Sequence, residues 1–176
     1  MTDPRYPIGT FQPQEHITEE QRRQLIQQIV EAPTNLRAAV SGLNAQQLNT
    51  SYRDGGWTVQ QVVHHVPDSH LNAFVRFKLA LTEENPTIKP YHEDRWAELA
   101  DARTTPIEAS LQLLESLHTR WITLIRAMKP EDFQRTFFHP ENKKTMSLDD
   151  LVQLYAWHGR HHTAQITSLK ERMGWK

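Results

Sequence analysis

The sequence predicts an all-α protein, a four-helix bundle with one long crossover connection. Four segments carry apolar residues at the three- and four-residue spacing of amphipathic helices, at about residues 18–41, 58–83, 107–129 and 147–173. The link between the second and third segments, about residues 85–105, is much longer than the usual connection in a compact domain. Four long helices with one such link are typical of a bundle in which the link crosses over.

The first two helices have clear start signals. The first begins at Thr18, whose side chain can cap it, and two acidic residues follow in its first turn. Gly42 is a stop signal after it, and Pro33 predicts a kink inside it. The second begins at Thr58 after the turn sequence DGGW, and Pro67 predicts an interruption or a bend near its middle.

The third and fourth helices flank a short segment of different character. Pro130 ends the third helix, and residues 131–146 contain PEN between two short runs, which indicates a small hairpin. Ser147 caps the fourth helix, which runs to about Met173. Residues 1–16 hold three prolines and no helical period, so we expect an extended lead-in.

Composition restricts the class of protein. The length of 176 residues and the 38% apolar content predict one domain, residues 1–176. The net charge of −1 gives no broad basic field for nucleic acid or anionic membranes, and no segment approaches the roughly 20 apolar residues of a membrane helix. Without cysteine there is neither a disulfide nor a thiolate ligand, which fits a reducing compartment. With no signal-peptide pattern, we expect a soluble cytoplasmic protein whose metal ligands, if any, are His, Asp, Glu or water.

Three histidines lie close together in the fourth helix. His158 and His162 fall on its apolar face, four positions apart, so their imidazoles project from the same side and can bind one cation together. His161 falls to the side of that face or away from it. The alternative is that these are hydrogen-bonded core histidines, because an unsatisfied buried polar group costs about 1–3 kcal/mol.

A catalytic zinc ion usually takes a third protein ligand. The second helix offers His64, His65 and His70. His65 lies near the core on a polar stripe that is either a solvated face or a cavity wall, whereas His64 is expected to point outward and His70 falls in the apolar stripe. The other members of the polar stripe are Gln61, Asp68 or Ser69, Asn72 and Arg76. His118, on the core face of the third helix, stays open as a ligand or as a partner of a ligand. Three loop histidines are expected at the surface: His16, His92 and His139.

Two motifs resemble the signatures of a known family. The stretch WTVQQVVHHVPDSH, with His65 eight positions after Trp57, and the closing WHGRHHTAQI, with His158 and His162, are similar to the two histidine motifs of the DinB superfamily. The stretches YPIGTF and VRFKLALTEENPTIKPY resemble its YfiT-like branch, described as metal-dependent hydrolases and, in bacilli, as bacillithiol S-transferases. The resemblance implies a four-helix bundle, a zinc or nickel ion on His65, His158 and His162, and a homodimer.

The first functional hypothesis is therefore a metal-dependent enzyme. Its ion would activate water, as in a hydrolase, or a low-molecular-weight thiol, as in an S-transferase, against a small electrophilic substrate. Candidates for contacts to the substrate or the ligands are Gln61, Asp68, Asn72 and Tyr155. The second hypothesis is a non-catalytic bundle with a structural ion, for which a fourth ligand such as His118 or a carboxylate is required. A third is a bundle without metal, in which the histidines serve the core.

Overall fold

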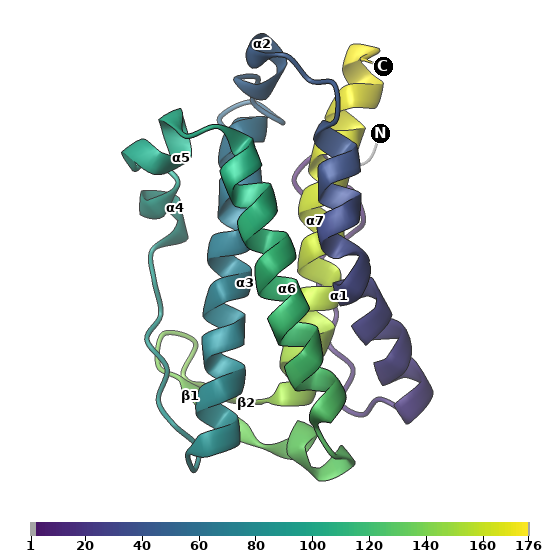
Figure 1. The fold of residues 1–176 in the computed structure, drawn as a ribbon, viewed down its shortest axis with the longest axis vertical. Helices are drawn as coiled ribbons and strands as arrows, with labels where there is room; N and C mark the ends of the chain where they lie inside the picture. Colours follow the sequence, from purple (N-terminus) through teal and green to yellow (C-terminus); the bar gives the residue numbers. More distant parts are fainter. Residues whose placement is uncertain (1–2, 176) are drawn as a thin grey trace.

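Four long helices build the protein, whose computed structural model describes residues 3–175. They are α1 (Glu19–Val40), α3 (Val59–Thr82), α6 (Ile107–Ala127) and α7 (Leu148–Met173), and they pack side by side as a bundle (Figure 1). The predicted all-α class and four-helix architecture are confirmed. No described helix is both long enough and apolar enough to cross a membrane.

The direction of the helices explains the long connection. Figure 1 shows α1 and α7 running one way and α3 and α6 running the other way. Because α3 and α6 are consecutive and parallel, the chain must return along the bundle between them. Residues 83–106 make this return and include two short helices, α4 (Glu93–Trp96) and α5 (Ala100–Thr104), which lie against α3. The predicted crossover is confirmed.

Local capping fixes where the long helices begin. Thr18, Thr58 and Ser147 each accept a hydrogen bond from the backbone three residues on, and the side chain of that residue bonds back. Pro33 and Pro67 lie inside continuous helices, so the interruption expected at Pro67 does not occur. Both rings are buried, and we attribute the continuity to packing that outweighs the loss of one backbone hydrogen bond.

The shorter elements tie the crossover to the end of the bundle. They are α2 (Ala45–Leu48), the 3₁₀ helix η1 (Pro130–Gln134), β1 (Thr136–His139) and β2 (Lys144–Ser147). The two strands pair in antiparallel register, as the hairpin prediction expected. Phe138 of β1 donates its N–H to the Pro86 carbonyl at 2.9 Å and accepts from the Ile88 N–H at 3.0 Å. The hairpin thereby anchors the start of the crossover.

The core consists of two apolar clusters with a polar layer between them. One cluster surrounds Trp121 at the hairpin end, and the other surrounds Leu114 at the opposite end. Along α7 the first cluster ends at Ala156 and the second resumes at Ile166. The histidines of α7 and the middle of α3 occupy the gap, which places them inside the bundle.

Three histidines are more buried than periodicity predicted, at 5% exposure for His64, 8% for His139 and 5% for His161. His64 bonds to the Thr105 carbonyl at 2.9 Å in the crossover, which covers the outer face of α3. His161 lies under the N-terminal segment, with its ring 5.8 Å from that of Tyr6. The corrections at His64 and His161 share one cause, because the helix pattern does not show which irregular segments cover a face. His139 was expected in a loop, and it instead ends strand β1 of the hairpin.

Candidate metal centre

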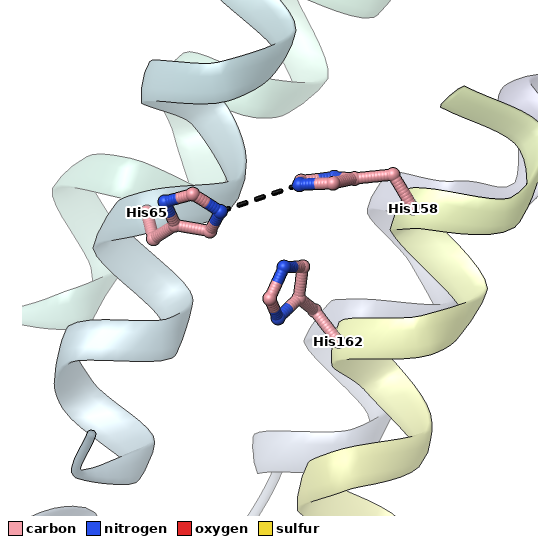
Figure 2. A group of neighbouring side chains, drawn as sticks. All are labelled: His65, His158 and His162. Carbon is pink, nitrogen blue, oxygen red and sulfur yellow. Dashed lines mark hydrogen bonds between the residues drawn. The ribbon is translucent and has the colours of Figure 1, made fainter. Parts of the chain in front are cut away.

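Three histidine rings converge between α3 and α7. His65 comes from α3, and His158 and His162 come from successive turns of α7 (Figure 2). One ring nitrogen from each lies within 4.8 Å of the other two. The sequence-predicted set is therefore brought together, and the i, i+4 spacing on α7 aims two of its rings at the same point.

The spacing of one pair of these nitrogens matches that of two ligands on a divalent ion. Nε2 of His65 and Nε2 of His158 are 3.2 Å apart. A tetrahedral ion with zinc–nitrogen bonds of about 2.0–2.1 Å holds neighbouring ligand nitrogens about 3.3 Å apart. The donor set fits zinc, copper, iron or nickel, which all accept imidazole.

A chain of hydrogen bonds sets the protonation of His158. Nδ1 of His118 lies 2.9 Å from the Ile29 carbonyl, which can only accept, so His118 donates from Nδ1 and accepts at Nε2. His70 then donates from Nδ1 to His118 at 2.8 Å and accepts at Nε2 from Nδ1 of His158 at 3.2 Å. With neutral rings, Nε2 of His158 is left with its lone pair toward the centre.

A second backbone carbonyl sets the protonation of His162. The amide nitrogen of Gln165 donates to the Arg5 carbonyl at 3.2 Å, which leaves its amide oxygen as the acceptor for Nδ1 of His162 at 2.9 Å. Nε2 of His162 is then free of a proton. The two α7 rings therefore present lone pairs because backbone carbonyls on α1 and on the N-terminal segment fix their tautomers.

Burial keeps the rings neutral. It lowers the pKa of His65 to about 4, with a further contribution from His161. It also places the pKa values of His158 and His162 well below the ordinary value, reinforced by the neighbouring histidines. Neutral imidazole is the charge state that binds metals, so burial favours metal binding by these three rings at neutral pH.

The three rings face a cavity of about 410 Å³. The N-terminal segment contributes Arg5 and Tyr6 to its wall, the segment before α3 contributes Arg53 and Trp57, and the crossover contributes Glu93. The Trp57 ring packs 4.7 Å from the His65 ring. The cavity is large enough for a small molecule beside the histidines.

The other sequence candidates take different positions. Gln61 donates to the Ala97 carbonyl at 2.7 Å, and Asn72 donates to the backbone of Asp68 at 2.9 Å. Tyr155 packs its ring 5.4 Å from that of His158, while its hydroxyl donates to the Ser69 carbonyl at 3.1 Å. Burial, helped by Asp101, raises the pKa of Asp68 to about 6.

His118 is a partner in the hydrogen-bond chain rather than a fourth ligand. Both of its ring nitrogens are engaged, one by His70 and one by the Ile29 carbonyl. Within residues 3–175, the group of potential ligands at this centre comprises three histidines and no carboxylate. The roles of His70 and Gln165 went unpredicted, although the position of Gln165 three residues after His162 was a usable signal.

Comparison with known proteins identifies the family. Residues 28–166 match the model of the DinB superfamily. Relatives from Bacillus cereus (strain 03BB102) and Bacillus thuringiensis subsp. konkukian (strain 97-27) are each 55% identical over 175 residues, covering 99% of this chain and 100% of the relative. Both carry the name "Putative metal-dependent hydrolase".

The solved structures include a similar protein. YfiT from Bacillus subtilis, described as a probable metal-dependent hydrolase with an unusual four-helix bundle topology, has 48% identity and a TM-score of 0.97. The match covers 99% of this chain and 100% of YfiT. With its histidine motifs, its fold and these relatives in agreement, the chain belongs to the DinB superfamily and resembles YfiT within it.

Proposed function

We propose that this protein is a metal-dependent hydrolase that holds a zinc or nickel ion on His65, His158 and His162 and acts on a small-molecule substrate. The observation that carries the proposal is the convergence of three neutral imidazoles, two of them with tautomers fixed by backbone carbonyls. The names of the 55% identical relatives support the reaction class.

A divalent ion on three neutral ligands supplies Lewis acidity and lowers the pKa of a coordinated water to about 7 in favourable sites. Residues of the chain orient the three histidines and move the proton. His118 and His70 orient His158, Gln165 orients His162, and the Trp57 ring limits the movement of His65. We assign proton transfer to Glu93, the one carboxylate among the described residues that line the cavity.

Thiol transfer is the second candidate. The chain has no cysteine, so a thiol nucleophile must arrive as a separate small molecule, and the cavity has room for one beside a substrate. Arg53 in the wall favours an anionic thiol over a neutral one, whereas the charge of Arg5 is compensated by its ion pair with Asp3. The same three histidines serve either nucleophile.

A purely structural ion is less well supported. Structural zinc sites are usually closed by four protein ligands. Here three converge among the described residues, beside an open cavity, and His118 is engaged elsewhere. This arrangement favours an exchangeable position on the ion and therefore catalysis.

The first test is the metal content of purified protein, measured by mass spectrometry. We expect about one ion per chain in the wild type and a large loss in His158→Ala and His162→Ala. His161→Ala is the matched control, since it removes a buried histidine from the same helix that is not in the ligand group. Equal metal content in all four proteins contradicts the proposed centre.

The second test separates the two reactions. Metal-loaded protein is given ester and amide substrates without thiol, and a generic electrophile with a panel of small thiols. Turnover without thiol that is lost in Glu93→Gln supports hydrolysis, and thiol-dependent loss of the electrophile supports transfer. If the metal-loaded protein is inactive in both assays, the result favours the alternative in which the ion is structural.

We also propose that the chain is one domain, forms a homodimer and acts in the cytoplasm. The dimer follows from the family resemblance, and the compartment follows from the cysteine-free composition. Light scattering after gel filtration tests the dimer, cell fractionation tests the compartment, and a single cooperative unfolding transition tests the one-domain assignment.

A further inference from the structure

Arg76 on α3 is a buried arginine that has no hydrogen-bond or ion-pair partner among the described residues. Its residue exposure is 8%, and its Nε atom is one of the few buried polar atoms of the described chain that make no hydrogen bond. Within residues 3–175, no ion pair includes its guanidinium. By contrast, Arg22 is neutralised by Asp149 at 2.6 Å. Arginine is almost never buried unless it is paired, so the isolation of Arg76 calls for a functional explanation.

Two carboxylates, Glu93 and Glu141, act on the same neighbours as Arg76, but neither forms an ion pair with it among residues 3–175. Its titratable neighbours include His139, Tyr91 and Tyr155. Burial, and then the charge of Arg76, lower the pKa of His139, whereas burial raises the pKa of both tyrosines. All three side chains are therefore neutral at neutral pH, and none supplies an anion.

Arg76 lines a cavity of about 800 Å³. Val75, Leu79, Ile88 and Trp96 give this cavity apolar walls, and Lys89 adds a second positive charge. Glu141 is its one carboxylate among the described residues, and it lies beyond ion-pair distance of Arg76. The combination of apolar walls with a basic group at one point is typical of a small-molecule site.

This cavity is separate from the metal centre. The two cavities share no wall residue, since Tyr91 and His92 of the crossover face one and Glu93 faces the other. Arg76 follows His65 by eleven residues on α3, a rise of about 16 Å along the helix. A small molecule bound at Arg76 therefore does not need the ion.

We propose that the Arg76 cavity is a second binding site, whose ligand is an organic carboxylate with an apolar body. The carboxylate would accept hydrogen bonds from the guanidinium and neutralise it, and the apolar body would lie against Trp96 and Ile88. A planar guanidinium matches a carboxylate better than an ammonium does, which explains an arginine at this position. The site is independent of the proposed hydrolase activity.

The test uses 4-phenylbutyrate as the probe and its neutral amide as the matched control. Binding is measured by calorimetry on the full-length protein, both metal-loaded and after chelator treatment. We expect saturable binding of the carboxylate in both forms and about tenfold or more weaker binding of the amide, because the neutral amide cannot form a charge-assisted pair with the guanidinium. If the protein shows no hydrolase activity, the expected binding of the carboxylate is unchanged.

Three variants assign the binding to Arg76. Arg76→Met is expected to bind the carboxylate about tenfold or more weakly, and Arg76→Lys is expected to lie between it and the wild type. Arg120→Met removes the same charge from an exposed position on α6 and is expected to bind normally. A wild type that does not bind, that binds the amide equally well, or that matches Arg76→Met overturns the proposal.

Thermal melting separates a ligand site from a structural arginine. Without ligand, Arg76→Met is expected to melt at the wild-type temperature or above it, because methionine fills similar space without an unpaired charge. Glu141→Gln is expected to melt unchanged and to bind the carboxylate equally or more tightly. A lower melting temperature in both variants shows instead an internal Arg76–Glu141 pair and refutes the site.

Discussion

Replacing His70 with phenylalanine is expected to weaken metal binding, although His70 is not one of the three converging histidines. The substitution removes the acceptor for Nδ1–H of His158 and the donor to Nε2 of His118, which lie 3.2 Å and 2.8 Å away. Phenylalanine keeps a ring of similar size at this fully buried position. The perturbation therefore acts on hydrogen bonding more than on volume.

The magnitude follows from what His158 does when its partner is lost. A buried N–H without an acceptor costs about 1–3 kcal/mol. His158 can avoid this cost by moving its proton to Nε2, but Nε2 then no longer offers a lone pair to the ion. When the ion binds Nε2, the proton must return to Nδ1, where it again lacks an acceptor. We therefore expect the variant to bind metal about 10- to 100-fold more weakly, a loss of about 1.4–2.7 kcal/mol.

The assay is a competition titration with a chromogenic chelator, with circular dichroism to confirm that the variant is folded. His161→Phe is the control, because His161 is also buried and its bond goes to Gln165 rather than to a metal-binding ring. Its affinity is expected to change much less. Wild-type affinity in a folded His70→Phe protein refutes the idea that this chain of histidines fixes the ligand tautomer.

Three further outcomes concern stability. First, acid should unfold the protein: the buried histidines have folded pKa values below their unfolded value of about 6.5, for example about 4 for His65, so the unfolded state binds more protons. The contribution of these histidines to the free energy of unfolding is fully present above about pH 6.5 and is lost toward about pH 4, by at most about 1.4 kcal/mol per pH unit for each such histidine. The raised pKa of Asp68 acts in the opposite direction. Equal urea midpoints at about pH 7 and about pH 5 contradict this prediction. Second, Gly159→Val should lower the free energy of unfolding by about 1–3 kcal/mol, because even a Cβ at this position lies 3.0 Å from the Ala32 Cβ on α1; an unchanged denaturant midpoint rules out this close contact. Third, Asp149→Ala should cost about 1–3 kcal/mol in urea unfolding by leaving the partly buried Arg22 without its carboxylate, and adding Arg22→Met should recover much of the loss.

Features set by neighbours in the chain were predictable from the sequence. The caps at Thr18, Thr58 and Ser147 depend on side chains within three residues, and all three helix starts are confirmed. The convergence of His158 and His162 follows from the repeat of the helix. The choice of His65 came from a family motif, and its position beside both rings of α7 agrees with that choice.

Features set by contacts between distant segments were not predictable. The polar stripe of α3 looked like one surface, but its members separate: Gln61 bonds to the crossover, His65 joins the centre and Arg76 lines another cavity. His70 was assigned to the apolar stripe, and its bonds to His118 and His158 require the relative placement of three helices. Helical periodicity carries the phase of one helix and no information on that placement.

The N-terminal segment has a consequence for how this protein can be shortened or fused. The Arg5 carbonyl holds the amide of Gln165, and the Gly9 carbonyl accepts from the Trp157 indole at 3.2 Å, so this extended segment is seated on α7. A truncated protein that began at α1 would keep all three converging histidines yet lose the carbonyl that sets one tautomer and part of the cavity wall. Affinity tags and fusion partners are therefore better attached at the C-terminus, and a truncated protein with weak activity reports on the missing segment rather than on the histidines.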